Sequence, residues 1–556
     1  YYKENYYNFN IYTEYTHQFN QKHDFHVMGG FQAENLKQTQ FGLQRDGIMF
    51  PNKPQVDLTN GLDYDGNPIT PSVNGSRNDW ATAGFFGRIN YSYDGKYLLE
   101  ANLRADGTSR FRKGNQWKTF PSFSLGWNVA REHFFEPLNN IVNILKFRAS
   151  YGLLGNQNTT NWYQTYQTMS VGSSNGAWLM NGNKPNTASA PGLVSASLTW
   201  ETIESYNLGL DWGVFNNRLT GSFDWYIRDT KNMVGNAPEL PALLGTGVPI
   251  TNNTDLRTSG WELSIGWNDR LNNGFTYGAK FNVSDARTKI TRYPNNPTKA
   301  VSTYIEGRYT NEIWGYTTVG LAKTDEEMQA HLATMPNGGQ SALGSDWKAG
   351  DIMYADINGD GKISGGSGTL NDTGDWTVIG NTTPRYLFGL DLNASWKGFD
   401  LRMFFQGVMK RDFWQGSTYL FGASNSGMWH ATGIESVSDY FRNDDTWSVQ
   451  EGYQSPNLNS YLPRPLYSNK NLQTQTRYLQ SAAYIRLKNL QLGYTFPTRL
   501  TSRYGVQNLR IYFSGENLWT GTSLVDQFDP ETISGGSGGN GYPLSRTLSC
   551  GLSVTF

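Results

Sequence analysis

The strongest constraint on this chain is its final stretch, residues 548–556, where two kinds of side chain alternate. The apolar positions are Leu548, Cys550, Leu552, Val554 and Phe556, and the small polar ones are Ser549, Gly551, Ser553 and Thr555. A period of two predicts a β-strand with one apolar and one polar face. In a soluble sheet such a final strand would add an exposed edge, whereas a closed barrel in lipid pairs its last strand with its first. We therefore expect the apolar face to contact acyl chains and the polar face to line a wet lumen.

Strands of the same kind recur in pairs along the chain. Apolar and polar residues alternate at 85–93 and again at 97–105, with Asp94 and Gly95 between them. Asp-Gly between alternating runs is a strong hairpin signal. Such runs reach about a dozen residues, more than the five or six of a typical soluble strand and enough to cross hydrocarbon at a tilt. We count about 15 strands, with short turns alternating with long loops, as in outer-membrane barrels.

Two local features interrupt this pattern. The apolar parity changes between 487 and 490, which predicts a β-bulge at Asn489. In the long stretch after 286, Thr324 and Glu327 have the spacing of a capping box and predict one clear helix, beginning just after Thr324.

Composition and charge narrow the class further. Hydrophobic residues make up 37% of the chain and aromatic residues 14%, a combination that suits rings placed at a membrane interface. No apolar run approaches the roughly 18 residues of a membrane helix, so any crossing is expected to use strands. With 46 basic and 47 acidic residues, the chain has no electrostatic footprint for nucleic acid. Cys550 is the only cysteine, which excludes an internal disulfide.

These observations predict an all-β chain in which residues 1–556 form a transmembrane antiparallel β-barrel portion. No linker or charge block divides it. The long polar stretches at 36–79, 154–197, 286–384 and 411–480 are expected to be extracellular loops. The first segment is already strand-like and shows no signal peptide, so we interpret the chain as part of a mature protein whose beginning lies outside this sequence.

One loop carries the sharpest chemical motif. Asp356, Asn358 and Asp360 place oxygen side chains at positions 1, 3 and 5 of a curled loop, Gly361 follows at position 6, and the Lys362 carbonyl is at position 7. This is the ligand pattern of an EF-hand-type calcium loop, with Ile363 as its anchor. An EF-hand closes with Glu at position 12, but Ser367 stands here, and Asp372 and Asp375 are the next carboxylates. The alternative is an Asx-rich turn that holds no metal.

The polar loops also contain many aromatic residues. Rings among Asn, Gln, Ser and Asp are suited to stacking on sugars, and five residues are candidate substrate contacts: Trp162, Tyr166, Trp178, Trp414 and Trp429. For each single residue we favour another role, which is packing the long loops into a stable external mass or forming an interfacial girdle.

Motifs along the whole chain resemble the SusC/RagA-type TonB-dependent transporters of Bacteroidetes. They are FGRINY (86–91), RADGTSRF (104–111), FPSFSLGW (120–127), LKFRASYG (145–152), GNQ (155–157), SGWEL (259–263), GDIMYAD (350–356), VIGN (378–381), KGFDL (397–401), FFQG (404–407), YIRLKNLQLGY (484–494), SGENL (514–518) and YPL (542–544) with Arg546. The resemblance implies an outer-membrane barrel of 22 strands, about 15 of them in this chain, with the plug, the TonB box and the early strands outside this sequence.

The resemblance also implies partners and a ligand. We expect a SusD-like surface lipoprotein as a lid, the TonB complex as energy source, surrounding outer-membrane lipid, and a dimer of SusC–SusD pairs. In the family an Asp shortly before the Ile-Gly-Asn triplet closes the cation loop. Asp375 holds that place here, after an insertion of eight residues, and gives a structural Ca²⁺ set of Asp356, Asn358, Asp360, Lys362 and Asp375.

We therefore expect an importer of glycan oligomers that performs no chemistry on its cargo, since no motif supplies a catalytic group. Three alternatives remain open: an importer of oligopeptides, a passive porin, and a soluble glycan-binding β protein. A TonB box and plug in the full gene would exclude the passive porin, and partition into water without detergent would favour the soluble protein.

Overall fold

The computed structural model describes residues 1–157, 159, 161–169, 171–173, 179–188, 191–241, 243, 245–421, 438–534 and 541–556. It contains two compact units. The first consists of Tyr1–Asn128, Arg148–Asn207 and Arg228–Asp255, and the second of Val129–Phe147, Leu208–Ile227 and Leu256–Phe556. Within the described ranges, no helix is both long enough and apolar enough to span a bilayer.

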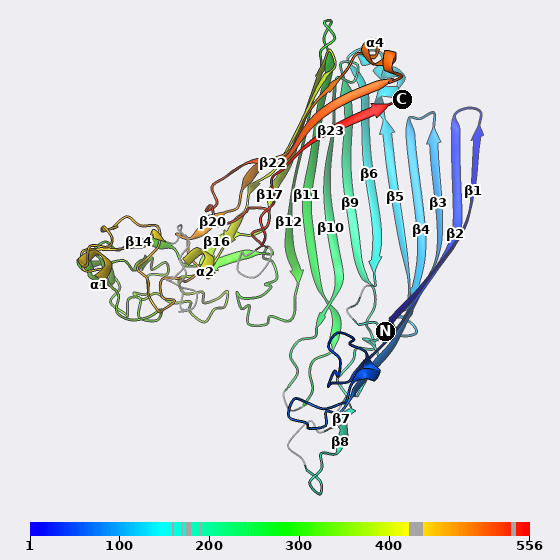
Figure 1. Ribbon diagram of the computed structural model, residues 1–556. Helices are drawn as coiled ribbons and strands as arrows, with labels where there is room; N and C mark the ends of the chain where they lie inside the picture. Colours follow the sequence, from blue (N-terminus) through cyan, green and yellow to red (C-terminus); the bar gives the residue numbers. More distant parts are fainter. Residues whose placement is uncertain are drawn as a thin grey trace. The chain divides into compact units, whose positions relative to one another are not determined.

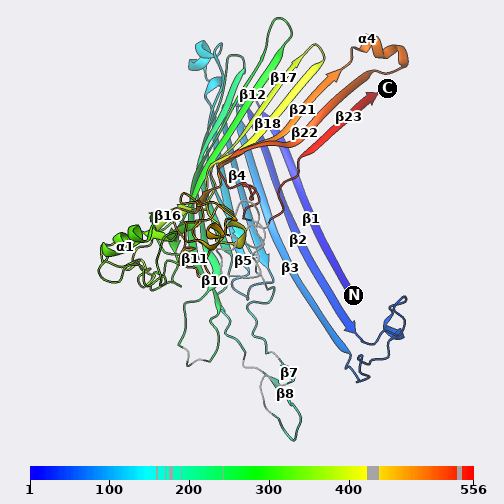
Figure 2. The ribbon, with the colours of Figure 1, turned by 60° about the vertical axis from the view of Figure 1, so that its left-hand side comes forward.

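One sheet of 15 strands contains most of the regular structure, and its strands are neighbours in chain order. They are β1 (Tyr2–Phe19), β2 (His23–Gln44), β3 (Ser72–Tyr93), β4 (Tyr97–Thr108), β5 (Trp117–Asn128), β6 (Val142–Asn156), β9 (Glu201–Val214), β10 (Leu219–Asn236), β11 (Ile250–Arg270), β12 (Thr276–Arg292), β17 (Arg385–Trp396), β18 (Phe399–Lys410), β21 (Tyr484–Thr495), β22 (Asn508–Thr522) and β23 (Thr547–Thr555). This agrees with the predicted tally. Figure 2 shows β1, β2 and β3 side by side at one end of this order.

Short turns join the strands on one side, as the sequence predicts. β3 and β4 pair antiparallel from Thr82–Thr108 to Tyr93–Tyr97. Asp94 and Gly95 both have positive φ, 52° and 63°, which is the geometry of a type I′ turn and matches the twist of the flanking strands. The Lys96 N–H closes the turn by donating to the Tyr93 carbonyl at 2.8 Å.

The strands have two unlike faces. On β4, Leu99 and Leu103 are exposed, at 39% and 55% of their surface. On the opposite face of that strand, the Asn102 amide accepts from Arg88 Nε at 2.8 Å and donates to Glu100 at 2.8 Å. Exposed leucines on one face and a polar network on the other are the inverse of a soluble sheet.

The second unit also contains a separate hydrophobic core built from its long connections. We call this set the loop core; its buried members are Tyr316, Leu321, Ala322, Met328, Met335, Trp347, Ala349, Ile352, Met353, Tyr354, Ile363, Leu420, Phe421, Phe441, Leu462, Tyr478, Ala482, Leu524, Phe528 and Ile533. They come from three stretches that are far apart in sequence. Figure 1 shows the small elements of this region, α1, β14, α2, β16 and β20, gathered together.

Short elements complete the fold. The strands are β7 (Val171–Ser173), β8 (Asn186–Ala188), β13 (Glu312–Gly315), β14 (Thr318–Leu321), β15 (Ile352–Tyr354), β16 (Thr377–Asn381), β19 (Asp412–Trp414) and β20 (Leu479–Ser481). The helices are α1 (Asp325–Ala333), α2 (Thr418–Phe421), α3 (Trp447–Gln450) and α4 (Thr498–Thr501), with 3-10 turns at Val56–Leu58, Val129–Arg131, His133–Leu138 and Ser502–Tyr504. They form the pairs β7–β8, β13–β16, β14–β15 and β19–β20.

The predicted helix is confirmed as α1. Thr324 is its N-cap, and the Thr324 hydroxyl accepts from the Glu327 N–H at 3.2 Å. The Glu327 carboxylate accepts from the Lys323 N–H at 2.7 Å, one residue before the position that an ideal capping box would use. Met328 then enters the loop core fully buried.

Several predicted positions differ from the structure; for example, β6 and β12 run to Asn156 and Arg292, past the predicted loop starts at 154 and 286. The bulge in β21 lies at Lys488 rather than Asn489, because β18 and β22 both skip that residue in their registers. The Lys488 side chain bonds Glu531 at 3.0 Å. Strands β2 and β3 also extend beyond the predicted loop limits, to Gln44 and from Ser72, because their backbones continue to pair through polar sequence.

The two faces of β4 give a labelling prediction. In a Cys550→Ser background, a cysteine at Asn102 should react with a water-soluble, membrane-impermeant maleimide, and a cysteine at Leu103 should react far more slowly in lipid because acyl chains cover it. In a refolding titration, Leu103→Asp should lose on the order of 2 kcal/mol of folding free energy. Asn102→Asp is the matched control, since it keeps an acceptor for Arg88. Equal labelling at both positions would contradict the two-faced barrel.

Candidate cation loop and strand-end pockets

A fully buried carboxylate organises the region from which the cation loop emerges. Asp351 has no exposed surface. It accepts hydrogen bonds at 2.8 Å from Arg464, Lys470 and Asn471. Burial alone would raise the pKa of Asp351, but these three donors outweigh it and hold the pKa below its ordinary value. Asp351 therefore stays ionised at neutral pH. Its bonds join the segment just before β15 to residues 464–471, which precede β20.

The predicted cation loop follows directly from this anchor. The strand β15 is fully buried, and the chain turns outward after Tyr354. At the far end of the loop Ile363 is fully buried in the loop core, and its N–H donates to the Gly339 carbonyl at 2.7 Å. Ile363 thus has the anchoring role that the sequence predicts.

Backbone amides point at the predicted ligand side chains. The Asp356 carboxylate accepts from the Gly359 N–H at 2.7 Å and from the Gly361 N–H at 2.8 Å. Both glycines have left-handed φ, 73° and 79°, which side-chain-bearing residues rarely adopt. Two further bonds continue the curl, from the Asp360 N–H to Asn358 Oδ1 and from the Lys362 N–H to Asp360 Oδ1.

Asp375, rather than Asp372, returns to this loop. The Asp375 side chain is fully buried and accepts from the Ile357 N–H at 2.8 Å and from the Ser364 N–H at 2.9 Å, so it joins the two ends of the loop. Asp372 instead accepts from the Ser367 N–H at 2.8 Å and closes the turn of the insertion. The insertion therefore forms its own turn and leaves Asp375 beside the loop.

The loop offers oxygen donors, but its carboxylates do not converge. Across the described part of the chain, no group of three or more His, Cys, Asp or Glu side chains is arranged to hold a metal ion. The Asp360 carboxylate lies 4.0 Å from Lys362 Nζ. A carboxylate oxygen that accepts one N–H keeps a second lone pair, so Asp356 and Asp375 retain capacity for a cation. The donor set therefore fits a hard cation in chemistry, and calcium stays a prediction.

The five aromatic candidates fall in different surroundings. Tyr166 is 55% exposed, and the Arg110 guanidinium lies 6.0 Å from the ring of Trp162. Trp414 packs against the loop core, with its ring 6.2 Å from that of Phe421, which is the packing role favoured above. Trp178 and Trp429 lie outside the described residues.

A pocket of about 430 Å³ lies on the polar face of β10, β11, β12, β17, β18 and β21 in the second unit. Its walls combine the carboxylates of Asp224 and Glu262, the amides of Asn282 and Gln406, and aromatic rings. The rings are those of Phe388, Phe404 and Tyr484. Sequence analysis identified the polar parity of these strands but did not single out the pocket, because strand alternation alone does not reveal which neighbours the sheet brings together.

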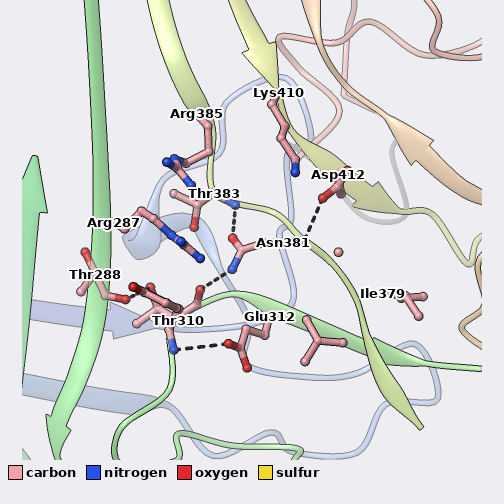
Figure 3. Close-up of a pocket in the computed structure, with 13 residues that line it drawn as sticks. Arg287, Thr288, Thr310, Glu312, Ile379, Asn381, Thr383, Arg385, Lys410 and Asp412 are labelled. Atoms are coloured by element: carbon pink, nitrogen blue, oxygen red, sulfur yellow. Dashed lines mark hydrogen bonds between the residues drawn. The ribbon is translucent and has the colours of Figure 1, made fainter. Parts of the chain in front are cut away.

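A second pocket, of about 290 Å³, lies where β12, β17 and β18 meet β13 and β16 (Figure 3). Lys410, Arg287 and Arg385 contribute positive charge to its lining. Asn381, from the motif VIGN, is held centrally: its amide donates to the Thr310 carbonyl at 2.9 Å and accepts from the Thr383 N–H at 2.8 Å. The only sequence signal for this pocket is the motif VIGN, whose four residues line it. The motif indicates the family resemblance but does not by itself indicate a pocket.

Comparison with known proteins identifies the family to which this chain belongs. The family described as "TonB dependent receptor-like, beta-barrel" matches residues 1–408. TonB-dependent receptor P3 of Formosa agariphila is 28% identical over 560 residues, covering 96% of this chain and 51% of that protein. TonB-dependent receptor SusC of Bacteroides thetaiotaomicron is 26% identical over 556 residues, covering 99% of this chain and 50% of that protein. The chain thus spans about half the length of these curated relatives.

A solved structure gives the same architecture. The structure of the RagAB peptide transporter matches with a TM-score of 0.77 and 22% identity, covering 100% of this chain and 56% of that chain. At 22% identity, this match shows that the two chains share a fold. Together with the family match it confirms the predicted antiparallel transmembrane β-barrel and the resemblance found in the sequence.

The buried Asp351 cluster gives a stability prediction. Asp351→Asn leaves Lys470 and Arg464 without their buried counter-charge and should cost about 3–5 kcal/mol of the free energy of unfolding of the loop core. Because the folded-state pKa of Asp351 is lowered, its contribution is present above the unfolded pKa of about 3.9 and is lost as pH falls through the folded value. Urea-dependent proteolysis of the full-length protein at neutral and acid pH measures both effects.

The control for this experiment is Asp444→Ala, which removes an exposed carboxylate from the same region. It should change stability by less than about 0.5 kcal/mol. An Asp351→Asn protein as resistant as the wild type at neutral pH would show that the cluster does not stabilise the loop core.

Proposed function

Since the chain belongs to the β-barrel family of TonB-dependent receptors, we propose that it is the barrel portion of a SusC-like importer that moves oligosaccharides across the bacterial outer membrane. The observation that carries this proposal is the sheet of 15 neighbouring strands with exposed apolar side chains on one face and polar side chains on the other. The family consists of outer-membrane proteins, and this chain is an outer-membrane β-barrel. A transporter of this kind binds its cargo and releases it unchanged.

The polar-face pocket favours saccharide as cargo. Sugars present hydroxyl groups at their edges and apolar C–H faces, and they are bound where carboxylates or amides stand beside aromatic rings. The pocket has polar groups that can bond sugar hydroxyls, from Asp224, Glu262, Asn282 and Gln406. It also has aromatic rings that can stack on the C–H faces, from Phe404 and Tyr484. The second candidate function is oligopeptide import; it is favoured by the structural match to the RagAB peptide transporter. A passive porin is the third.

We further propose the partners that a SusC-like importer requires. A SusD-like surface lipoprotein would act as a lid, the TonB complex would supply energy through parts of the protein outside this chain, and two such pairs would form a dimer. The loop core supports the lid proposal, because a connection that is packed around a hydrophobic core presents a fixed surface to a partner, at a lower entropic cost on binding than a flexible loop.

Uptake measurements test the proposed function. Cells that express the full-length protein should accumulate a labelled oligosaccharide, and accumulation should stop when TonB is deleted or the proton-motive force is dissipated. A labelled oligopeptide of similar mass is the parallel substrate. Oligopeptide uptake alone would assign the second candidate function, and uptake that persists without TonB would assign the porin.

We propose that the cation loop binds Ca²⁺ in a structural role. Asp356, Asn358 and Asp360 would ligate through side-chain oxygens, Lys362 through its carbonyl, and Asp375 would complete the set. When bound, the ion would draw together the three carboxylates, which do not converge without it, and would balance their charge. The amide bonds to Asp356 and Asp375 support the proposal because they pre-organise two of these side chains. An affinity in the millimolar to sub-millimolar range is expected for such an external site.

Calcium removal tests this site. In the full-length protein, Ca²⁺ should raise the protease resistance of residues 351–375, and chelation should lower it, because the ion restrains the loop. Asp360→Ala should abolish this calcium response. Asp372→Ala is the matched control and should keep it, since Asp372 serves the turn of the insertion. A wild-type loop whose protease resistance does not change with Ca²⁺ or chelation would favour the metal-free Asx turn, and a response that persists in Asp360→Ala would exclude Asp360 as a ligand.

A further inference from the structure

The second pocket, lined by Arg287, Arg385, Lys410, Glu312 and Asp412 and here called the strand-end pocket, holds more positive charge than its own carboxylates balance. We propose that it binds a singly charged oxyanion, a sulfate ester or a carboxylate, carried by the cargo. The inference deepens the proposed function and rests on it, because it names the class of oligosaccharide to be imported as an anionic one. The charges, the strand register and the backbone geometry that support it all lie within the second unit.

Most charges around the pocket are already paired. The Arg385 guanidinium forms an ion pair with Asp285, which is buried. The Glu312 carboxylate pairs with Arg308 at 2.8 Å. This leaves Lys410, Arg287 and Asp412. Among the described residues neither cation forms a salt bridge, and Arg287 shares the charge of Asp285 with Arg385. Asp412 is held by the Asn381 N–H, which donates to Asp412 Oδ2 at 3.0 Å.

The strand register places two of the cations directly opposite each other. Arg385 is the first residue of β17 and pairs with Lys410, the last residue of β18. Like charges at directly opposed positions destabilise a sheet. Asp285 compensates Arg385 but leaves Lys410 uncompensated, so a bound anion would remove an unfavourable interaction as well as forming favourable ones.

The backbone beside this pair has an uncommon conformation. Tyr386, the next residue of β17, has a φ of 53°, in the left-handed region that non-glycine residues seldom occupy. Such strain persists only where surrounding contacts impose it, and it is concentrated at binding sites. Here it accompanies the Arg385 side chain that reaches Asp285 in the neighbouring strand β12.

The unpaired cations are placed to share one ligand. The Arg287 guanidinium stacks on the Tyr309 ring, 3.7 Å from its centroid, which fixes its plane and leaves its edge N–H groups to donate. In Figure 3 the Lys410 and Arg287 side chains extend from different strands toward Asn381 and Thr383. Two cations and one carboxylate leave a net charge of about +1, so a group of charge −1 neutralises the pocket. This favours a sulfate ester or carboxylate over the dianion of a phosphate monoester.

Direct binding to the purified full-length protein tests the proposal. The probes are a sulfated oligosaccharide, its desulfated form and a uronic acid oligosaccharide, titrated calorimetrically in detergent. The sulfated probe, the uronic acid probe or both should bind more tightly than the desulfated one. Lys410→Gln should weaken that binding about tenfold, as expected for the loss of one charge-assisted hydrogen bond. Lys410→Arg should restore it. Lys397→Gln, at the other end of the same strand pair, is the matched control and should bind like the wild type.

The outcomes separate this inference from the proposed function. Equal affinity for the sulfated, uronic acid and desulfated probes, or equal affinity of Lys410→Gln and the wild type, overturns the oxyanion site. Tighter binding of a phosphorylated lipid headgroup than of either anionic probe overturns the assignment to cargo. TonB-dependent uptake of the sulfated, uronic acid and desulfated probes reports on the importer, so a protein that takes up none of the three but shows the Lys410 effect in calorimetry would retain the site and lose the proposed function.

Discussion

The organisation of the external connections depends on one buried negative charge. Asp351 is fully enclosed and joins residues 113, 119 and 120 positions away along the chain. A buried charge is costly unless its partners surround it, so the cluster forms only when the two stretches meet in one arrangement. It thereby selects a single register between them, and the apolar side chains of the loop core then supply the burial that stabilises this arrangement.

The cation loop and the strand-end pocket both depend on that arrangement. β15 lies directly after Asp351 and ends where the cation loop begins, and Ile363 returns the loop to the same core. On the other side, β16 pairs with β13 and presents Asn381 to the pocket. The loop core is therefore a second scaffold, distinct from the sheet, and it fixes the positions of polar side chains that the strands alone would leave free to move.

Sequence periodicity predicted the sheet well because strand alternation is a local property that can be detected within about a dozen residues. The Asp94–Gly95 turn, the Thr324 cap and the anchoring by Ile363 are likewise written in neighbouring residues. Packing of the long loops was predicted in general terms, but most members of the loop core could not be identified, because they are separated by long polar stretches with no common period. The bulge at Lys488 was predicted one residue too late, and its Lys488–Glu531 contact joins partners 43 positions apart that neighbouring residues do not reveal.

The two unlike faces of each strand constrain how this chain can change in length. Adding one residue inside a strand moves every later side chain of that strand to the opposite face, placing charges in lipid and leucines in water. Only a bulge such as the one at Lys488 can absorb such a change, by leaving one residue out of the ladder. Extra length is tolerated elsewhere, as in the turn between Ile363 and Asp375, whose two ends are held by a single carboxylate. Evolution of this chain would thus proceed by substitution in the strands and by insertion in the loops.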